Sequence, residues 1–351
     1  MSDVEKLLEN IKKGTASWSD YETFLKLNND EIEPFLHLSE DITIQNFHNN
    51  LKIYIPNKRF PAISVTGNEC ALECAHCDKK YLDGMKPISS NNDLENFLMN
   101  LSKEGGKGVL LSGGCEPDGS VPLLNYLDTV KKVKAKTNLI INTHTGLLNE
   151  STAKKLAEAK VDIVSFDINL DDEIIRDIYH LDKDIMDYKR AVKLLLKYNL
   201  NIVPHICIGL HYGELHKEIE SIKFIKETGI NPSLIVLIAL IPPKNSQVLF
   251  KRPKPQDIAK VIATIRFNFP RTELSLGCMR PRGDIKVDIE KYAIKAGITR
   301  IEIPSKITLK WVKQVNPAIK LKFFSACCAI PKEFDDFAES KDSDIKGYLN
   351  I

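Results

Sequence analysis

The chain has 351 residues, of which 43% are hydrophobic and 27% are charged, as in an ordinary folded globular protein. Its 49 basic and 47 acidic residues nearly cancel, which argues against binding nucleic acid through a strongly basic surface. No run of about 18 apolar residues predicts a membrane span, and the first residues lack the pattern of a secretory signal peptide. We therefore expect neither nucleic acid nor membrane among its partners. Eight cysteines in a chain of this length indicate metal binding or catalysis in a cytoplasmic protein, not a disulfide scaffold.

Residues 1–58 predict an amphipathic helical extension. Leu7, Leu8 and Ile11 have helical spacing, and two further short helices are expected at 18–27 and 31–38. The segment contains several aromatic residues that need burial. We therefore interpret it as a cap on the main domain, with a disordered tail as the less favoured alternative.

Residues 59–303 predict a repeating alternation of strands and helices. Short β-branched runs predict eight strands, at 61–66, 108–112, 138–143, 161–166, 201–208, 233–240, 272–276 and 298–302. Charged amphipathic segments predict seven helices between them, at 92–103, 121–135, 150–159, 184–198, 214–228, 255–267 and 286–296. This alternation predicts an α/β fold with a parallel sheet, and eight strands suit a (β/α)8 TIM-type barrel. An open, doubly wound sheet is the alternative.

Residues 304–351 are expected to form a C-terminal extension. It contains one predicted helix near 307–314, then the adjacent pair Cys327-Cys328, then a polar, acidic end. Adjacent cysteines do not readily form a disulfide with each other, because their side chains diverge. Both can instead supply ligands to one metal centre.

Three cysteines follow the first predicted strand within eight residues, namely Cys70, Cys74 and Cys77. Thiolate sulfur suits iron–sulfur clusters and zinc, and three local ligands leave one metal position free for a further ligand. Zinc knuckles usually have paired C-x2-C halves, and this chain has only one such pair. A zinc site or three unrelated thiols remain the alternatives to a cluster.

The C-x3-C-x2-C spacing resembles that of the radical S-adenosylmethionine (SAM) superfamily. In that family three cysteines hold a 4Fe–4S cluster whose open iron binds SAM, and reductive cleavage of SAM gives a 5′-deoxyadenosyl radical. An aromatic residue usually precedes the third cysteine, and His76 has that place here. The resemblance therefore implies Cys70, Cys74 and Cys77 as cluster ligands, with His76 beside SAM.

Polar residues at the other strand ends are expected near this centre, because active sites of α/β barrels lie at the carboxyl ends of the strands. The pair Gly113-Gly114 resembles the glycine-rich motif with which the superfamily binds the SAM amino group. Asp167 and Asn169 share one face of an extended chain, and the equivalent strand end of biotin synthase contacts the ribose of SAM. A surface turn is the alternative there. His144 either points into the barrel mouth or begins a helix.

The remaining cysteines suggest a second metal centre. A second 4Fe–4S cluster would need four ligands, and four further cysteines could supply them, namely Cys115, Cys278, Cys327 and Cys328. Structural thiols are the alternative. We interpret the fifth, Cys207, as a buried structural thiol. Arginines follow Cys278, and we expect Arg280 and Arg282 to recognise the carboxylate of SAM or of a substrate.

Residues 60–302 resemble biotin synthase, but that enzyme's barrel cysteines are not in place, and a Cys-Cys tail has been added. The whole pattern is similar to the archaeal and bacterial biotin synthase homologue group, which includes one half of a two-protein lipoyl synthase. This implies sulfur insertion into octanoyl-lysine on a carrier protein. It also implies a second radical SAM component and an electron donor such as ferredoxin or flavodoxin. The alternatives are another radical SAM reaction (methylation, rearrangement or ring cleavage) with an electron-transferring second cluster, and a non-enzymatic iron–sulfur scaffold.

Overall fold

A computed structural model describes residues 2–244 and 249–340. Three helices begin the chain, α1 (Asp3–Lys12), α2 (Trp18–Lys26) and α3 (Glu33–Phe47). Ser2 and Ser17 start the first two of them with capping boxes, which satisfy free amides of the first turn. These helices pack against one another and against α9: the ring of Phe24 lies 4.7 Å from Phe35 and 6.0 Å from Phe267 of α9.

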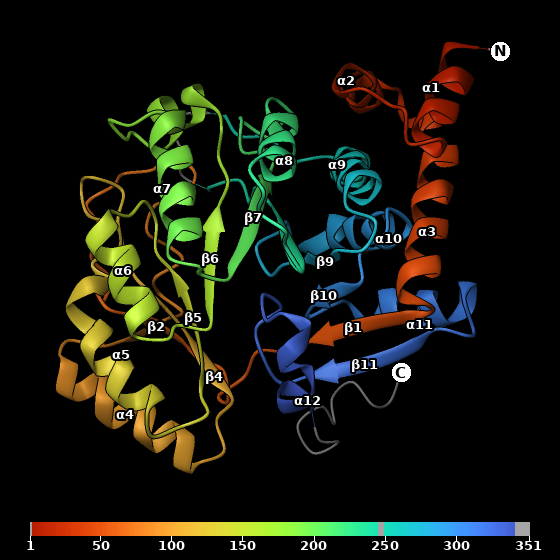
Figure 1. Ribbon diagram of the computed structural model, residues 1–351. Coiled ribbons are helices and arrows are strands. Elements are labelled where there is room, and N and C mark those ends of the chain that lie inside the picture. Colours follow the sequence, from red (N-terminus) through yellow and green to blue (C-terminus); the bar gives the residue numbers. More distant parts are fainter. Residues whose placement is uncertain (1, 245–248, 341–351) are drawn as a thin grey trace.

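Within the described residues, the strands form one parallel sheet with eleven members (Figure 1). The strands are β1 (Asn50–Tyr54), β2 (Ala62–Ser64), β3 (Lys86–Pro87), β4 (Gly108–Ser112), β5 (Ile140–His144), β6 (Ile163–Asp167), β7 (Ile202–Ile208), β8 (Leu234–Ala239), β9 (Glu273–Leu276), β10 (Arg300–Glu302) and β11 (Lys320–Phe324). Their order is β11-β1-β10-β9-β8-β7-β6-β5-β4-β2-β3.

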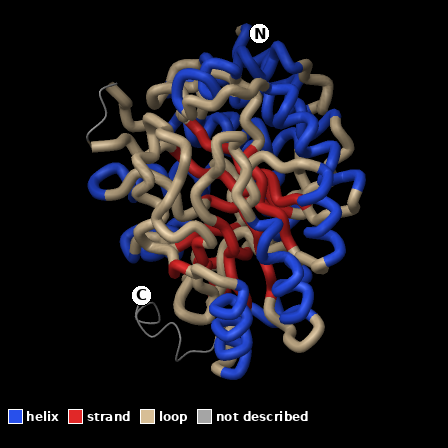
Figure 2. Tube along the Cα trace, turned by 90° about the vertical axis from the view of Figure 1, so that its left-hand side faces the viewer, coloured by secondary structure: helices blue, strands red, loops and turns tan. Residues whose placement is uncertain are grey.

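Helices connect the strands and cover the outer face of the sheet. They are α4 (Asn91–Lys103), α5 (Leu127–Lys134), α6 (Glu150–Glu158), α7 (Ile185–Lys197), α8 (Glu218–Glu227), α9 (Pro255–Asn268), α10 (Lys286–Lys295), α11 (Lys306–Val315) and the short α12 (Asp335–Ala338). All eight predicted strands and all seven predicted connecting helices are present, so the predicted α/β fold class is confirmed. Figure 2 shows strands in the centre, with helices around them.

The barrel is a curled sheet whose first and last predicted strands do not pair. Within the two described ranges, the ladder runs from β11 to β3 without a pairing between β2 and β10. β1 pairs with β10, so that Lys52 is opposite Arg300, and β11 extends the sheet beyond β1. The prediction that residues up to 58 are helical is therefore wrong for 50–54, which form a strand of the main sheet. The C-terminal extension likewise contributes β11, which was not predicted.

The C-terminal segment after β11 fills the inside of the barrel at the amino ends of the strands. Ala326, Ile330 and Ala338 are buried there in one apolar cluster with Ile140 and Leu234, which begin β5 and β8. This packing covers the inner face of the sheet, which is open between β2 and β10 within the described residues.

A buried group of charges holds this segment in place. The ammonium of Lys52 lies 2.6 Å from Glu273 and 2.5 Å from Asp335, and the hydroxyl of Tyr54 donates to Asp335 at 3.1 Å. Arg300, which is fully buried, pairs with Glu273 and donates to the carbonyl of Ile330. Opposite charges compensate one another here, because a buried single charge would be costly.

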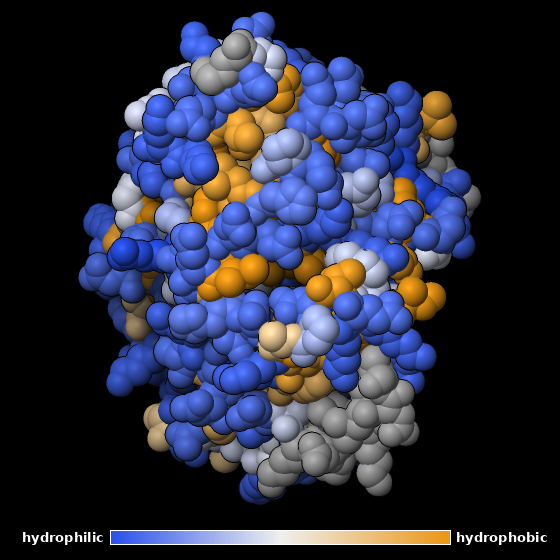
Figure 3. Space-filling view, turned by 90° about the vertical axis from the view of Figure 1, so that its right-hand side faces the viewer, coloured by the Kyte–Doolittle hydropathy of each residue, from blue (hydrophilic) through white to orange (hydrophobic). Residues whose placement is uncertain are grey.

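The outer face that carries α1, α3 and α11 is mostly hydrophilic, with separate hydrophobic patches (Figure 3). Exposed apolar side chains on these helices include Ile44, Ile307 and Val315. No helix in the part of the chain that the structure describes is both long and apolar enough to cross a membrane.

We predict that Arg300→Met lowers the free energy of unfolding by about 3 kcal/mol, because Glu273 would keep only Lys52 as a partner in a buried site. Urea unfolding measures this change. The matched control is Arg176→Met, which removes an exposed ion pair with Asp177 and should cost less than about 1 kcal/mol. Equal losses in the two variants would show that the buried charges do not hold the C-terminal segment.

Candidate functional site

Backbone hydrogen bonds anchor the loop with the three clustered cysteines at two points. The amide of Ala71 donates to the carbonyl of Cys115 at 2.8 Å, and the amide of Ala75 donates to the carbonyl of Ile178 at 2.8 Å. These bonds join the loop to the segment after β4 and to the π-helical turn Ile174–Ile178. The loop therefore has a set position above the carboxyl ends of β4 and β6.

The three thiols lie in different electrostatic surroundings. Hydrogen bonds from Cys115, including its amide at 3.2 Å, lower the pKa of Cys70. Burial raises the pKa of Cys74 to about 12. Within the described ranges, Cys70, Cys74 and Cys77 do not have all three sulfurs within 4.8 Å of one another. Thiolates on one zinc ion lie about 4 Å apart, because each Zn–S bond is about 2.3 Å. The wider spacing fits a cluster in which each thiolate binds a different iron.

The glycine pair after β4 allows the chain to approach this loop closely. A Cβ on Gly114 would lie 2.0 Å from the carbonyl oxygen of Glu69 and 2.6 Å from the Cβ of Cys70. The amide of Gly114 donates to Thr66 Oγ1 at 2.7 Å. Gly113 also lies against Thr66, with 3.0 Å between the position of its Cβ and Oγ1. The structure therefore gives Gly114 a packing role beside Cys70, which the motif alone did not predict.

Three side chains from adjacent strands meet inside the barrel mouth. His144 of β5 and Asp167 of β6 are joined through Nε2 and Oδ2 at 3.2 Å, and the ring of His205 of β7 lies 5.8 Å from that of His144. The side chains of His144 and Asp167 are 35% and 39% exposed, although their strands lie in the middle of the sheet. Both side chains are therefore accessible from the barrel mouth, and of the two alternatives for His144 the structure supports this one.

The pKa values of these three groups are shifted in different directions. Burial would lower the pKa of His144, but the carboxylate of Asp167 outweighs it and raises that pKa above its ordinary value. The pKa of Asp167 is lowered, because His144 outweighs the opposite effect of burial. Burial lowers the pKa of His205 to about 4, so this ring is neutral at neutral pH. Its Nδ1 lies 3.0 Å from the carbonyl of Val203 and donates to it, which leaves Nε2 as an acceptor.

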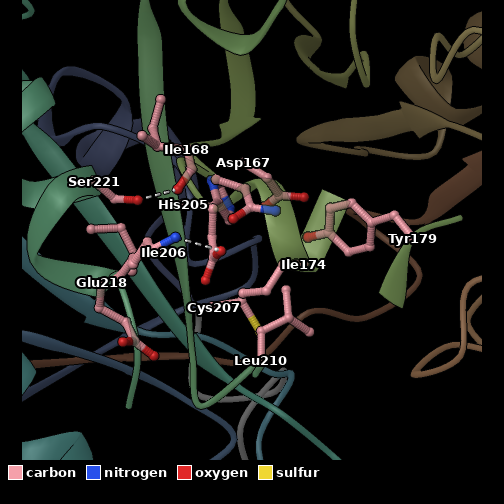
Figure 4. A pocket seen from close by; sticks show the side chains of 13 residues that line it. Asp167, Ile168, Ile174, Tyr179, His205, Ile206, Cys207, Leu210, Glu218 and Ser221 are labelled. Atoms are coloured by element: carbon pink, nitrogen blue, oxygen red, sulfur yellow. Dashed lines mark hydrogen bonds and ion pairs between the residues drawn. The ribbon is translucent and has the colours of Figure 1, made fainter. Parts of the chain in front are cut away.

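Three buried polar atoms on or beside Asp167 have no hydrogen-bond partner within the described residues. They are Asp167 Oδ1, Asn169 Nδ2 and His76 Nδ1, all buried. Asp167 and Asn169 also line a small cavity of about 20 Å³ with Tyr179 and Cys207 (Figure 4). Buried polar groups in native proteins are nearly always hydrogen-bonded, so these atoms fit a polar ligand such as the ribose and amino acid parts of SAM. Cys207 lies at this cavity, where we had expected a structural thiol.

His76 is the residue of the cysteine loop whose ring contacts Tyr179 of the cavity. Its ring lies 5.3 Å from that of Tyr179, whose carbonyl accepts from the thiol of Cys74 at 3.5 Å. Burial lowers the pKa of His76 to about 4, so the ring is neutral at neutral pH.

Comparison with known families agrees with this geometry. Residues 64–225 match the model of the Radical SAM superfamily. The chain contains a radical SAM domain. This domain includes the cysteine triad, the glycine pair and the cavity residues on β5, β6 and β7. The triad, with its free metal position and the unpartnered polar atoms beside it, fits a 4Fe–4S cluster and SAM.

Solved structures show the same fold at low sequence identity. The FeFe-hydrogenase maturase HydG from Carboxydothermus hydrogenoformans matches with a TM-score of 0.68 and 15% identity, over 96% of this chain and 82% of that one. Methylornithine synthase (PylB) matches with a TM-score of 0.61 and 15% identity, over 98% of this chain and 100% of that one. No curated protein sequence matches this chain. None of these findings distinguishes biotin synthase or lipoyl synthase from other radical SAM proteins.

A second group of cysteines lies outside the radical SAM domain. The thiol of Cys328 donates to Glu302 at 3.1 Å and contacts Cys327. Cys278 also hydrogen-bonds to Glu302, and its pKa is raised by the surrounding protein, by Glu302 and by Cys327. Three of the four cysteines predicted for a second cluster therefore gather around one buried carboxylate. The fourth, Cys115, lies beside Cys70 instead, which corrects the predicted grouping.

The two arginines after Cys278 differ in their surroundings. Arg280 is buried, and its guanidinium donates to Glu290 at 2.7 Å and to the carbonyls of Gly277 and Glu302 at 2.6 and 2.7 Å. It is thus engaged by the protein itself, and we do not retain it as a carboxylate-binding residue. Arg282 is exposed and remains available to a ligand.

Sequence reasoning missed Tyr81 and Glu302. Burial raises the pKa of Tyr81, and neighbouring Cys77, Cys207 and Cys278 raise it further. This tyrosine therefore lies near both the radical SAM domain's triad and the second cysteine group. A tyrosine four residues after Cys77 carries no recognisable motif, and Glu302 was visible only as the last residue of a predicted strand.

We predict that Gly114→Ala prevents most of the iron uptake at the triad, because a Cβ there would displace Glu69 and Cys70. Iron and acid-labile sulfide after anaerobic reconstitution measure the effect. Gly84→Ala is the matched control, since Gly84 lies on the same loop and its Cβ would meet no atom within 4 Å. Full iron content in Gly114→Ala would contradict the packing role.

Proposed function

We propose that this chain is a radical SAM enzyme that activates an aliphatic C–H bond, and that its reaction is sulfur insertion of the lipoyl synthase type. The observation that carries the first part is the cysteine triad beside a cavity with three unpartnered buried polar atoms. Cys70, Cys74 and Cys77 would hold the 4Fe–4S cluster. When bound, the cluster supplies the electron that cleaves SAM to methionine and a 5′-deoxyadenosyl radical.

The residues of the cavity would position SAM. Asp167 at the end of β6 and Asn169 two residues later offer an acceptor and a donor, which suits the two hydroxyls of a ribose. His76 offers a neutral ring beside the triad, and Gly113 and Gly114 bring the backbone close to it. Arg282 is the arginine that we assign to a carboxylate. The ion pair between His144 and Asp167 would hold the carboxylate in place while its free oxygen binds the ligand.

The second cysteine group supports the proposal of sulfur insertion. Sulfur insertion needs a source of sulfur near the activated carbon, and Cys278, Cys327 and Cys328 gather near Tyr81, which also neighbours the triad. We propose that these three thiols hold a second iron–sulfur cluster. The substrate would be octanoyl-lysine on a carrier protein, and the partners would be a second radical SAM component and ferredoxin or flavodoxin.

A first test is SAM cleavage under reducing conditions with an octanoylated carrier peptide. We expect 5′-deoxyadenosine and a thiolated peptide from the reconstituted protein, and neither from Cys74→Ser. Mass spectrometry of the peptide, with and without a partner protein, measures the outcome. Deoxyadenosine without thiolated peptide would support a different radical SAM reaction, and absence of SAM cleavage would support a non-enzymatic scaffold.

A second test concerns the two SAM-binding residues of β6. Asp167→Asn and Asn169→Ala should each weaken SAM binding by about tenfold or more, since each removes a partner from a buried polar group. Equilibrium binding of SAM to the reconstituted protein measures this. Asp128→Asn on the exposed surface of α5 is the control and should bind SAM as the unmodified chain does. Unchanged binding in both β6 variants would remove Asp167 and Asn169 from the SAM site.

A third test isolates the second cluster. The variant with Cys70, Cys74 and Cys77 all replaced by Ala should still take up iron and sulfide on anaerobic reconstitution. Further replacement of Cys278, Cys327 and Cys328 by Ser should abolish that uptake, whereas Cys207→Ser in the same background should keep it. A triple alanine variant without iron would refute the second cluster.

A further inference from the structure

A group of two histidines and one glutamate lies at the rim of the barrel and shares no residue with either cysteine group. Glu173 comes from the segment after β6, and His211 and His216 come from the segment after β7. One ligand atom from each residue lies within 4.8 Å of the other two. His211 Nε2 is 3.2 Å from a carboxylate oxygen of Glu173. Within the described ranges, no other histidine, cysteine or carboxylate group meets this spacing.

A buried carboxylate orients one of these histidines. Asp171, whose side chain is 2% exposed, lies 2.5 Å from Nδ1 of His216. At this distance the carboxylate of Asp171 accepts a hydrogen bond from Nδ1 of His216. This leaves Nε2 of His216 with a free electron pair. Metal-binding histidines almost always have such a carboxylate or carbonyl on the other ring nitrogen.

The two imidazole rings are also held close together. Their centroids are 4.0 Å apart and the ring planes differ by 18°. The stacked arrangement brings two imidazoles to one place, and neutral imidazole is the form that binds a metal ion. The nearby cations are Lys217, 3.4 Å from Asp171, and Arg176, which pairs with Asp177. Both are thus engaged by other carboxylates and leave Glu173 to the histidines.

From this geometry we propose that Glu173, His211 and His216 form a binding site for a divalent transition metal ion, with zinc as the fitting ion. Two imidazoles and one carboxylate are a common ligand set for zinc, and they leave a fourth position for water or another ligand. Asp171 acts as a positioning residue through His216. The side chains are partly exposed, at 49%, 24% and 30%, so the ion can enter from solvent.

The ion would add a further link between two loops that already meet through the contacts of His211 with Glu173 and of His216 with Asp171. These loops follow Asp167 and Asn169 on one side and His205 on the other, which are the residues of the cavity described above. The metal would therefore hold the rim of that cavity, and its binding should stabilise the folded chain by mass action. This inference does not depend on the proposed reaction.

The test uses the full chain after anaerobic reconstitution, with Zn²⁺ added and loosely bound metal removed on a chelating resin. We expect the unmodified chain to retain one more zinc per chain than His211→Asn or Glu173→Gln, measured by plasma mass spectrometry. Asp171→Asn should weaken zinc binding by about 10–100-fold, since it removes the negative charge behind His216. Zinc should raise the melting temperature of the unmodified chain and not that of His211→Asn.

His37→Asn is the matched control, because His37 is an exposed histidine 4.0 Å from both Glu33 and Glu40 but outside any such group. It should retain the zinc and the thermal shift. Equal zinc in His211→Asn and the unmodified chain would overturn the proposal. X-ray absorption at the zinc edge identifies the ligands of the bound zinc, independently of the proposed enzymatic function. Nitrogen and oxygen ligands support the site at Glu173, His211 and His216. Sulfur ligands would place the zinc in unfilled cysteine sites and refute the proposal.

Discussion

The buried charges around Arg300 hold together a barrel that its strands alone do not close. β2 and β10 do not pair within the described ranges, so the inner face of the sheet needs another cover. The segment after β11 supplies it, and its place is set by Arg300, Lys52 and Asp335. Because this segment also carries Cys327 and Cys328, the same ion pairs that stabilise the fold determine where those two thiols lie.

The protein thus has two cysteine groups with different origins. The first comes from a single loop and is local in sequence, and it belongs to the radical SAM domain that ends near residue 225. The second is assembled from β9 and from the C-terminal segment, around Glu302 of β10. Tyr81 neighbours both groups. This division agrees with the proposal that the triad's part of the chain generates the radical, whereas the part with the second cysteine group determines the product.

The sequence predicted what depends on local pattern. β-branched runs identified the eight strands, and the spacing of Cys70, Cys74 and Cys77 predicted the family match of residues 64–225. It did not predict β1 or β11, because their partners lie far away in sequence and each strand is only five residues long. Nor did it separate Cys115 from the other cysteines, or Arg280 from Arg282, since these differences depend on neighbours such as Cys70 and Glu290. The roles of the cavity residues toward SAM remain predictions.

The position of β1 in the sheet has a consequence for biosynthesis. β1 pairs with β10 and β11, whose residues are added to the growing chain about 250 residues later. At 5–20 residues per second, the ribosome needs roughly 12 to 50 s to make them, which is much longer than a helix or a hairpin needs to form. During that interval Leu51 and Ile53 have no strand to pair with. The sheet is therefore completed only at the end of translation, and Cys327 and Cys328 take their places beside Glu302 only after that.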